Sequence, residues 1–415
     1  MNPYLIFVLA VIIFSFLLEA LSDYLNVKNA AEELPEEFRG VYCSEDYRRS
    51  QAYLKENSRF SGYYGMFQAL LGLAMILGGG FNLIDLVARG FGLGSIPTGL
   101  VFFAMVALGF RALTLPFSLY RTFVIEEKYG FNRTTPRTYL ADLARWIALS
   151  VLIGGPVLAV ILWLFEAGGS LAWLYCWAAV AGFQLFALFL APVFILPLFN
   201  RFDPLPEGEL RAEIARYAEE QRFAMKGVYT MDGSKRSSKA NAFFTGLGAS
   251  RRIVLFDTLI EKHTVSELVA VLAHEMGHYV KGHISKMAAW SILQFGIVFY
   301  LLSLFINNRA LFDAFGMEQL SIHASLFFFS FLYQPLDVVL SVVAQAISRK
   351  HEYEADRYAV ETRGAPEALI DGLKKLSADS LSNLTPHPLK VLLAYRHPPI
   401  LERIAAIRRL SSRTA

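Results

Sequence analysis

Charged side chains are scarce in this sequence. Asp, Glu, Lys and Arg together make up 18% of its 415 residues, whereas about 25% is usual for soluble globular domains. Hydrophobic residues make up 55% of the chain. This balance argues against a soluble globular protein and predicts an integral membrane protein.

Cysteine and clustered positive charge are scarce as well. The two cysteines, Cys43 and Cys176, cannot form a disulfide framework and match no spaced thiolate metal site. The net charge is only +3, and no dense Lys/Arg run with interleaved aromatic residues occurs, so nucleic acid is not expected as a partner. A phosphate-loop pattern is absent, and Gly246 and Gly248 do not complete a dinucleotide fingerprint.

Apolar stretches of about 20 residues, the length that crosses the hydrocarbon core as a helix, recur along the chain. The first stretch lacks a basic n-region and a small-residue cleavage site, so we expect a retained spanning helix and not a signal peptide. Seven spans are predicted, at 3–21, 64–87, 96–117, 143–165, 171–190, 287–306 and 325–346. The predicted fold class is a mostly α, polytopic membrane protein.

Basic residues are concentrated in alternate connecting segments. Segments 22–61, 121–138, 201–286 and 349–415 hold nearly all of the Lys and Arg residues. The positive-inside rule places these segments in the cytoplasm and the N-terminus outside.

The spans and the long connecting segments predict four regions. Five spans fill 1–200, a soluble segment covers 201–286, two more spans fill 287–348, and a C-terminal segment covers 349–415.

The first long soluble segment reads as mixed α and β structure. An amphipathic helix is predicted at 206–222, and short strands at 228–231, 240–245 and 253–257. Asp232-Gly233-Ser234 and Gly246-Leu247-Gly248 between the strands are typical turn sequences. We expect a small antiparallel sheet.

A metal-binding pattern follows the strands. Thr264 and Glu267 have capping-box spacing, so a helix is expected to begin near Thr264. His274 and His278 then lie one turn apart on the same face, where they can share one ion. Two imidazoles and a carboxylate suit zinc and leave a position for water, whose proton Glu275 can accept. A pair of surface histidines is the alternative.

A third ligand is expected from the segment after the seventh span. Glu352 and Asp356 share a helix face, one to bind the metal and one to orient a ligand histidine. Glu354 lies about 200° around the helix from Glu352, so both cannot face the metal. His278 precedes the sixth span by about 13 Å of helix, and Glu352 follows the seventh by about 9 Å. If the sixth and seventh spans are antiparallel neighbours, His278 and Glu352 would therefore lie at a similar distance from the same membrane face.

Two further histidines are predicted to be surface residues. His283 is nine positions from His274 and would lie on the opposite helix face, and His351 lacks the helical phase of Glu352.

At this point the sequence resembles the Ste24 type of membrane zinc metalloproteases, the CAAX prenyl proteases of the M48 peptidase family. The likeness runs almost from end to end. Its carriers are 126–132 (EEKYGFN), 197–200 (PLFN), 204–208 (PLPEG), 241–243 (NAF), 274–278 (HEMGH), 348–356 (SRKHEYEAD) and 395–399 (YRHPP).

The resemblance implies about seven transmembrane helices around an intramembrane chamber, closed by a small α+β cytoplasmic metalloprotease domain. It makes Glu352 the third ligand of one Zn²⁺ per chain. The strand of Asn241, Ala242 and Phe243 would pair with extended substrate, and His397 would stabilise the oxyanion. Asp356 then orients a ligand histidine. By its sequence alone, His397 would be a loop residue before a helix.

The expected function is hydrolysis of peptide bonds in peptide or protein substrates that enter the chamber, with membrane lipids as the other partner. The compact soluble segments and the short C-terminal end fit a bacterial cytoplasmic membrane. Bacteria are not expected to prenylate such proteins, so cleavage of lipid-modified CAAX substrates and membrane quality control both remain open.

Two alternatives differ in kind. A non-catalytic transporter or chaperone-like module could keep the zinc site, although the open coordination position and the adjacent Glu275 argue against a structural site. A protease with zinc inside the bilayer is disfavoured, because the ligands lie outside the apolar runs.

Overall fold

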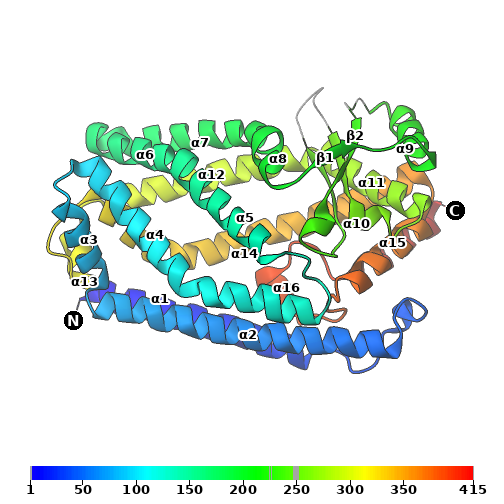
Figure 1. Cartoon of the computed structure of the whole chain (residues 1–415), viewed down its shortest axis with the longest axis horizontal. Helices are drawn as coiled ribbons and strands as arrows, with labels where there is room; N and C mark the ends of the chain where they lie inside the picture. Colours follow the sequence, from blue (N-terminus) through cyan, green and yellow to red (C-terminus); the bar gives the residue numbers. More distant parts are fainter. Residues whose placement is uncertain (1, 224, 226, 246–251, 415) are drawn as a thin grey trace.

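The computed structural model describes residues 2–223, 225, 227–245 and 252–414. Long helices run along the length of the molecule, and a small sheet gathers with α9 and α11 at one end (Figure 1). The N-terminus lies at the other end. The predicted turn at Gly246-Leu247-Gly248 lies outside the described residues.

Seven helical segments of the described chain are long and apolar enough to cross a membrane, which confirms the predicted number. Several include a π-helical turn. The segments are α1 (Pro3–Lys28), α2 (Ser44–Leu77), α4 with η2 (Ser95–Tyr120, Arg121–Glu126), α5 with η3 and α6 (Pro136–Leu149, Ser150–Gly154, Gly155–Ala167), η4 with α7, η5 and α8 (Gly169–Leu171, Ala172–Leu190, Ala191–Ile195, Leu196–Phe199), α12 (His283–Ser303) and α14 (Ile322–Arg363).

The second span differs from its predicted range of 64–87. Helix α2 begins much earlier, at Ser44, and ends at Leu77, and a separate helix, α3 (Gly80–Gly90), follows. Gly79 between them has a φ of +67°, a left-handed conformation that ends a helix and that glycine adopts without a steric penalty. The prediction missed this break because the residues on both sides are apolar.

Helix α14 joins the seventh span to the soluble part of the molecule. It continues for 42 residues without a break, from Ile322 to Arg363, and ends at Gly364 in a left-handed conformation. Pro335 lies inside it, as membrane helices tolerate. The helix therefore carries Glu352 rigidly out of the span.

The sheet is mixed, so the prediction of an antiparallel sheet is wrong in one pairing. Its strands are β1 (Phe202–Pro204), β2 (Gly227–Met231), β3 (Ala242–Thr245) and β4 (Arg252–Phe256), in the order β1-β2-β4-β3. Strands β2 and β4 are parallel, whereas β1 pairs with β2 and β3 with β4 antiparallel. Strand β3 lies at one edge.

The connection after β2 explains this topology. Asp232-Gly233-Ser234 does not close a hairpin but leads into a short 3₁₀ turn, η6 (Gly233–Lys235). The backbone N–H and hydroxyl of Ser234 both donate to Asp257, just beyond the end of β4. The chain thus passes the end of β4 before it returns as β3, and β4 occupies the centre.

Helix α11 (Val265–Val280) begins as predicted. The Thr264 hydroxyl accepts from the Glu267 N–H, and the Glu267 carboxylate accepts from the Thr264 N–H, which completes the capping box. The sequence predicted about 13 Å of continuous helix between His278 and the sixth span. This prediction is wrong. The chain turns at Gly282, whose φ is +68°, and α12 begins directly at His283.

The largest buried core lies in the soluble part. It joins α11 and the sheet to α9 (Glu209–Glu220), α15 (Pro366–Asp379) and α17 (Ile400–Thr414). The remaining helices are short: η1 (Glu36–Phe38), α10 (Asp257–Ile260), α13 (Arg309–Ala314) and α16 (Pro388–Ala394). Packing of α11 against α14 connects this core to the seventh span.

Candidate metal centre and active site

Helices α11 and α14 cross closely at the metal motif. A Cβ atom on Gly277 would lie 3.0 Å from the Cα of Ala355 and 3.1 Å from its carbonyl oxygen. Position 277 therefore leaves little room for a side chain, and the two helices approach more closely there than a larger residue would allow. This approach brings Glu352, one turn before Asp356, up to the two histidines of α11.

The three expected ligands converge. His274 Nε2 lies 3.1 Å from His278 Nε2 and 3.4 Å from Glu352 Oε2, and His278 Nε2 lies 3.3 Å from Glu352 Oε1. Ligand atoms about 2.1 Å from a tetrahedral zinc ion stand roughly 3.3 Å apart. The donor set and its spacing therefore fit zinc. His274 and Glu352 are buried, and His278 is partly exposed.

Asp356 contacts the ring nitrogen of His274 that faces away from the other two ligands. Its Oδ1 lies 2.8 Å from His274 Nδ1, so the imidazole can donate this hydrogen and keep Nε2 free to bind a cation. Burial opposes a charged imidazolium, yet the hydrogen bond that His274 donates to the Asp356 carboxylate outweighs it and raises the pKa of His274 to about 9. The site thus attracts positive charge.

Arg403 completes this side of the site, and the sequence analysis missed it. Its guanidinium bonds both Asp356 oxygens, at 2.6 and 2.9 Å, and lies 3.2 Å from Glu352 Oε2. All three side chains are almost fully buried. Helix α17 carries other arginines, and no local signal distinguishes Arg403 from them.

His283 and His351 are not surface residues, so that prediction is wrong. They are 3% and 6% exposed, and their rings stack with centroids 3.9 Å apart. His283 Nδ1 lies 3.0 Å from His278 Nδ1, and its Nε2 lies 3.0 Å from a Glu354 oxygen. The prediction assumed one continuous helix from His274 to His283. The chain turns at Gly282 and a new helix begins at His283, so the helical spacing from His274 does not apply to His283.

Two cavities meet at the candidate centre. One has a volume of about 690 Å³ and the other about 470 Å³, and Glu275, Glu352 and His397 line both. Burial raises the pKa of the Glu275 carboxyl above its usual range, although the neighbouring histidines His274 and His278 oppose this. A carboxylate with a raised pKa is suited to accept and return a proton.

His397 reaches the site from the loop before Pro398-Pro399. Its Nδ1 lies 2.9 Å from Glu352 Oε2, and 69% of its side chain is exposed where it faces the cavities. Its other ring nitrogen can therefore approach a bound substrate.

Residues 241–243 border the cavities along the sheet edge. Asn241 directly precedes β3, its carbonyl accepts the Phe256 N–H, and its side-chain oxygen accepts the Ala242 N–H at 2.8 Å. Asn241 and Ala242 line the larger cavity, and Phe243 lines the smaller. The free edge of β3 can pair with an extended peptide.

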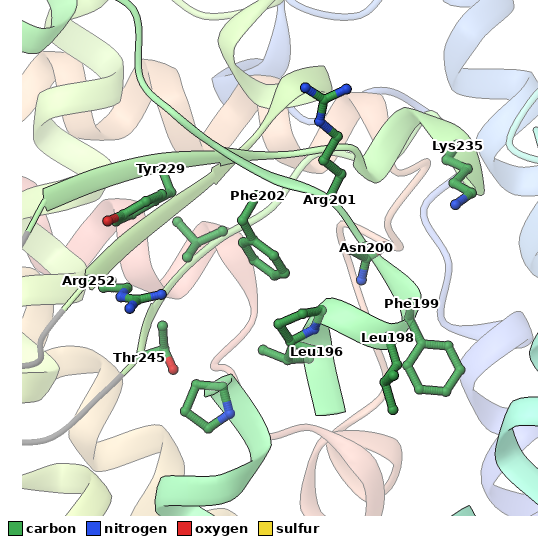
Figure 2. A pocket seen from close by; sticks show the side chains of 13 residues that line it. Leu196, Leu198, Phe199, Asn200, Arg201, Phe202, Tyr229, Lys235, Thr245 and Arg252 are labelled. Carbon is green, nitrogen blue, oxygen red and sulfur yellow. The ribbon is translucent and has the colours of Figure 1, made fainter. Parts of the chain in front are cut away.

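A separate cavity of about 520 Å³ lies between α8 and the sheet (Figure 2). Its lining includes Arg201, Lys235 and Arg252 and none of the residues of the two central cavities. Figure 2 shows the Arg252 side chain reaching toward Phe202 and Thr245. This cavity is not part of the candidate centre.

Comparison with known proteins agrees with this geometry. Residues 23–201 match the family described as CAAX prenyl protease N-terminal, five membrane helices, and residues 204–411 match peptidase family M48. The chain is 34% identical over 414 residues to the CAAX prenyl protease 1 homolog of rice, with 96% of each chain covered. It is 32% identical over 425 residues to CAAX prenyl protease 1 of *Saccharomyces cerevisiae*, with 95% of this chain and 92% of the yeast protein covered.

A solved structure has the same fold. The crystal structure of *S. mikatae* Ste24p superimposes with a TM-score of 0.93 at 31% identity, and the match covers 98% of this chain and 99% of the other. Together with the two family matches, this likeness includes both the spans and the metal motif. The chain therefore belongs to the M48 peptidase family and is a membrane-embedded zinc protease with an internal chamber.

Proposed function

We propose that His274, His278 and Glu352 hold one Zn²⁺ ion and that this site hydrolyses peptide bonds in the chamber. The observation that carries the proposal is the convergence of His274 Nε2, His278 Nε2 and the Glu352 carboxylate beside Glu275, at the junction of two cavities. Zinc bound there would polarise the peptide carbonyl and lower the pKa of a water molecule.

The side chains around the centre take distinct roles in this reaction. The Glu275 carboxylate accepts a proton from the attacking water and returns it to the leaving amine. The His397 imidazole donates a hydrogen bond to the oxyanion. The Asp356 carboxylate accepts the Nδ1 hydrogen of His274 and holds that ring in position.

Substrate backbone would bind along β3. Asn241, Ala242 and Phe243 lie at the start of this edge strand and border both cavities. Strand addition presents an extended peptide without dependence on its side chains.

Lipid-modified peptides are the favoured substrate class. A largely apolar cavity of about 650 Å³ lies among α6, α7 and α12, and it shares Leu188 and Ala288 with the smaller cavity at the centre. A hydrocarbon chain could lie there while its peptide reaches β3. The names of the related CAAX prenyl proteases agree with this class. Membrane quality control, with unmodified polypeptides as substrates, is the second candidate.

The orientation in the membrane follows from charge. The basic segments, which include most of the metal centre, are proposed to face the cytoplasm. The four regions 1–200, 201–286, 287–348 and 349–415 then alternate between membrane and cytoplasm.

The first test is the metal content of detergent-purified protein beside a Glu352→Ala variant. We expect close to one zinc per chain in the wild type and a sharp loss in the variant. If folded wild-type protein cannot hold zinc even after reconstitution, the protease proposal fails and a non-catalytic membrane module becomes the better explanation.

A matched pair of peptides tests the substrate class. The two peptides share one sequence ending in a cysteine-containing motif, and only one carries a farnesyl group on the cysteine. Faster cleavage of the farnesylated peptide supports lipid recognition. Equal cleavage of both favours quality control. The Glu352→Ala variant serves as the control for contaminating protease.

A further inference from the structure

The two ligand histidines are supported differently. His274 has a carboxylate on its Nδ1 side, from Asp356. Among the described residues, no carboxylate contacts His278 on that side. Its Nδ1 instead faces His283 Nδ1 at 3.0 Å, and His283 in turn faces a Glu354 oxygen at 3.0 Å. The series His278, His283 and Glu354 therefore ends in a negative charge, as does the shorter series at His274.

Only one arrangement of hydrogens suits this series when Nε2 of His278 binds a metal. The lone pair of Nε2 is then used, so a neutral His278 ring carries its hydrogen on Nδ1. That hydrogen is donated to His283 Nδ1, which must accept it. His283 consequently carries its own hydrogen on Nε2 and donates it to the Glu354 carboxylate. Each donor meets one acceptor, and every ring nitrogen of the two histidines is used.

The surroundings hold His283 in this orientation. Its side chain is 3% exposed, and its ring lies nearly parallel to that of His351, with an angle of 9° between the planes. His283 is the first residue of α12, so the Gly282 turn fixes its position relative to α11. Glu354 comes from α14, the helix that also supplies Glu352.

We infer that His283 and Glu354 are positioning residues that fix the ring orientation and tautomer of the metal ligand His278. This inference rests on the proposed zinc site. It explains why Glu354, which points away from the metal, still lies within the same network as Glu352. It also means that each ligand histidine is supported by a carboxylate, directly for His274 and through a second imidazole for His278.

The test is zinc affinity measured by competition with a chelator, together with the visible spectrum of the cobalt-substituted protein. In His283→Phe the ring can still stack on His351 but offers no acceptor to His278. We expect zinc affinity to fall about 10- to 100-fold, the usual cost of losing such a support, and the cobalt spectrum to shift. Glu354→Gln should give a smaller loss, because its amide oxygen still accepts from His283 without a charge.

Glu361→Gln is the matched control, since Glu361 lies exposed on the same helix. It should keep the wild-type affinity and spectrum. If folded His283→Phe keeps both, the inference is overturned, even where thermal stability falls. Should His283→Phe not fold, unchanged affinity in Glu354→Gln and in His283→Leu, which also offers no acceptor, overturns it. Absence of zinc from the wild type would instead contradict the proposed function.

Discussion

The membrane spans leave most of their apolar side chains exposed, whereas the metal domain buries apolar and charged side chains alike. In the seven spans, only 6% to 17% of the most apolar windows are buried within the protein. Many large apolar side chains are exposed there, such as Phe14 at 64% and Leu152 at 72%. In α11, ten of sixteen residues are buried, and the charged Glu352, Asp356 and Arg403 that pack near it are 3%, 1% and 6% exposed.

This difference indicates where specific contacts matter. Outward apolar residues are stabilised by hydrocarbon around the spans, which needs no particular partner. Buried charges are stabilised only by their own partners, because the cost of removing them from water is large. Substitutions should therefore be tolerated in the first region and costly in the second.

The largest expected effect is on catalysis at Glu275. Glu275→Gln keeps the shape of the side chain but cannot accept a proton, so turnover should fall up to about 10⁴-fold, about 5.5 kcal/mol of activation free energy. Zinc content should be unchanged, because Glu275 is not among the converging ligand atoms. The measurement is kcat on the farnesylated peptide, alongside zinc analysis. Near wild-type turnover in a protease-free preparation would contradict the assigned role.

The next largest effect is on folding, at Arg403. Arg403→Met leaves Asp356 and Glu352 without the cation that both contact, so the free energy of unfolding should fall by about 3–5 kcal/mol. Denaturant unfolding in detergent measures this loss.

Arg357→Met is the matched control for Arg403. Arg357 is exposed on α14, so its replacement should change stability little. Equal losses in the two variants would mean that burial of the ion pair does not explain the stability of this region.

The same contrast explains what the sequence could predict. Length and apolar composition were enough for seven spans, and helical spacing was enough to place His274 beside His278. The contacts that support the metal ligands from behind could not be predicted from length, composition or helical spacing. Arg403 reaches Asp356 only through the packing of α17, and His283 reaches His278 only because the chain turns at Gly282.

The sheet gives a second example. Local turn chemistry suggested adjacent hairpins, but strand order depends on the path of residues 232–241 past the end of β4. Nothing in the alternation of the strands specifies that path. The edge position of β3, on which the proposed substrate pairing depends, therefore emerged only with the tertiary structure.

A smaller effect is expected at the sheet edge. Asn241→Ala removes the acceptor of the Ala242 N–H and loosens the start of β3, so kcat/KM should fall about tenfold, or about 1.4 kcal/mol. Zinc content should not change. Thr230→Ala is the control, because the Thr230 hydroxyl on β2 donates a hydrogen bond to the Asp203 carbonyl on β1, while Thr230 lines neither central cavity. A loss of the same size in both variants would contradict a specific role for β3.

The smallest effect is expected in the spans, at Leu152. Its side chain is 72% exposed, so Leu152→Ala creates no cavity within the protein and should change the free energy of unfolding by less than about 0.5 kcal/mol. Leu272→Ala in α11 is the matched comparison. Leu272 is 0% exposed, and a loss of about 2–5 kcal/mol is expected there. The free energy of unfolding of both variants is measured in the same detergent. Comparable losses would show that the spans also depend on specific packing and would contradict the contrast between the two regions.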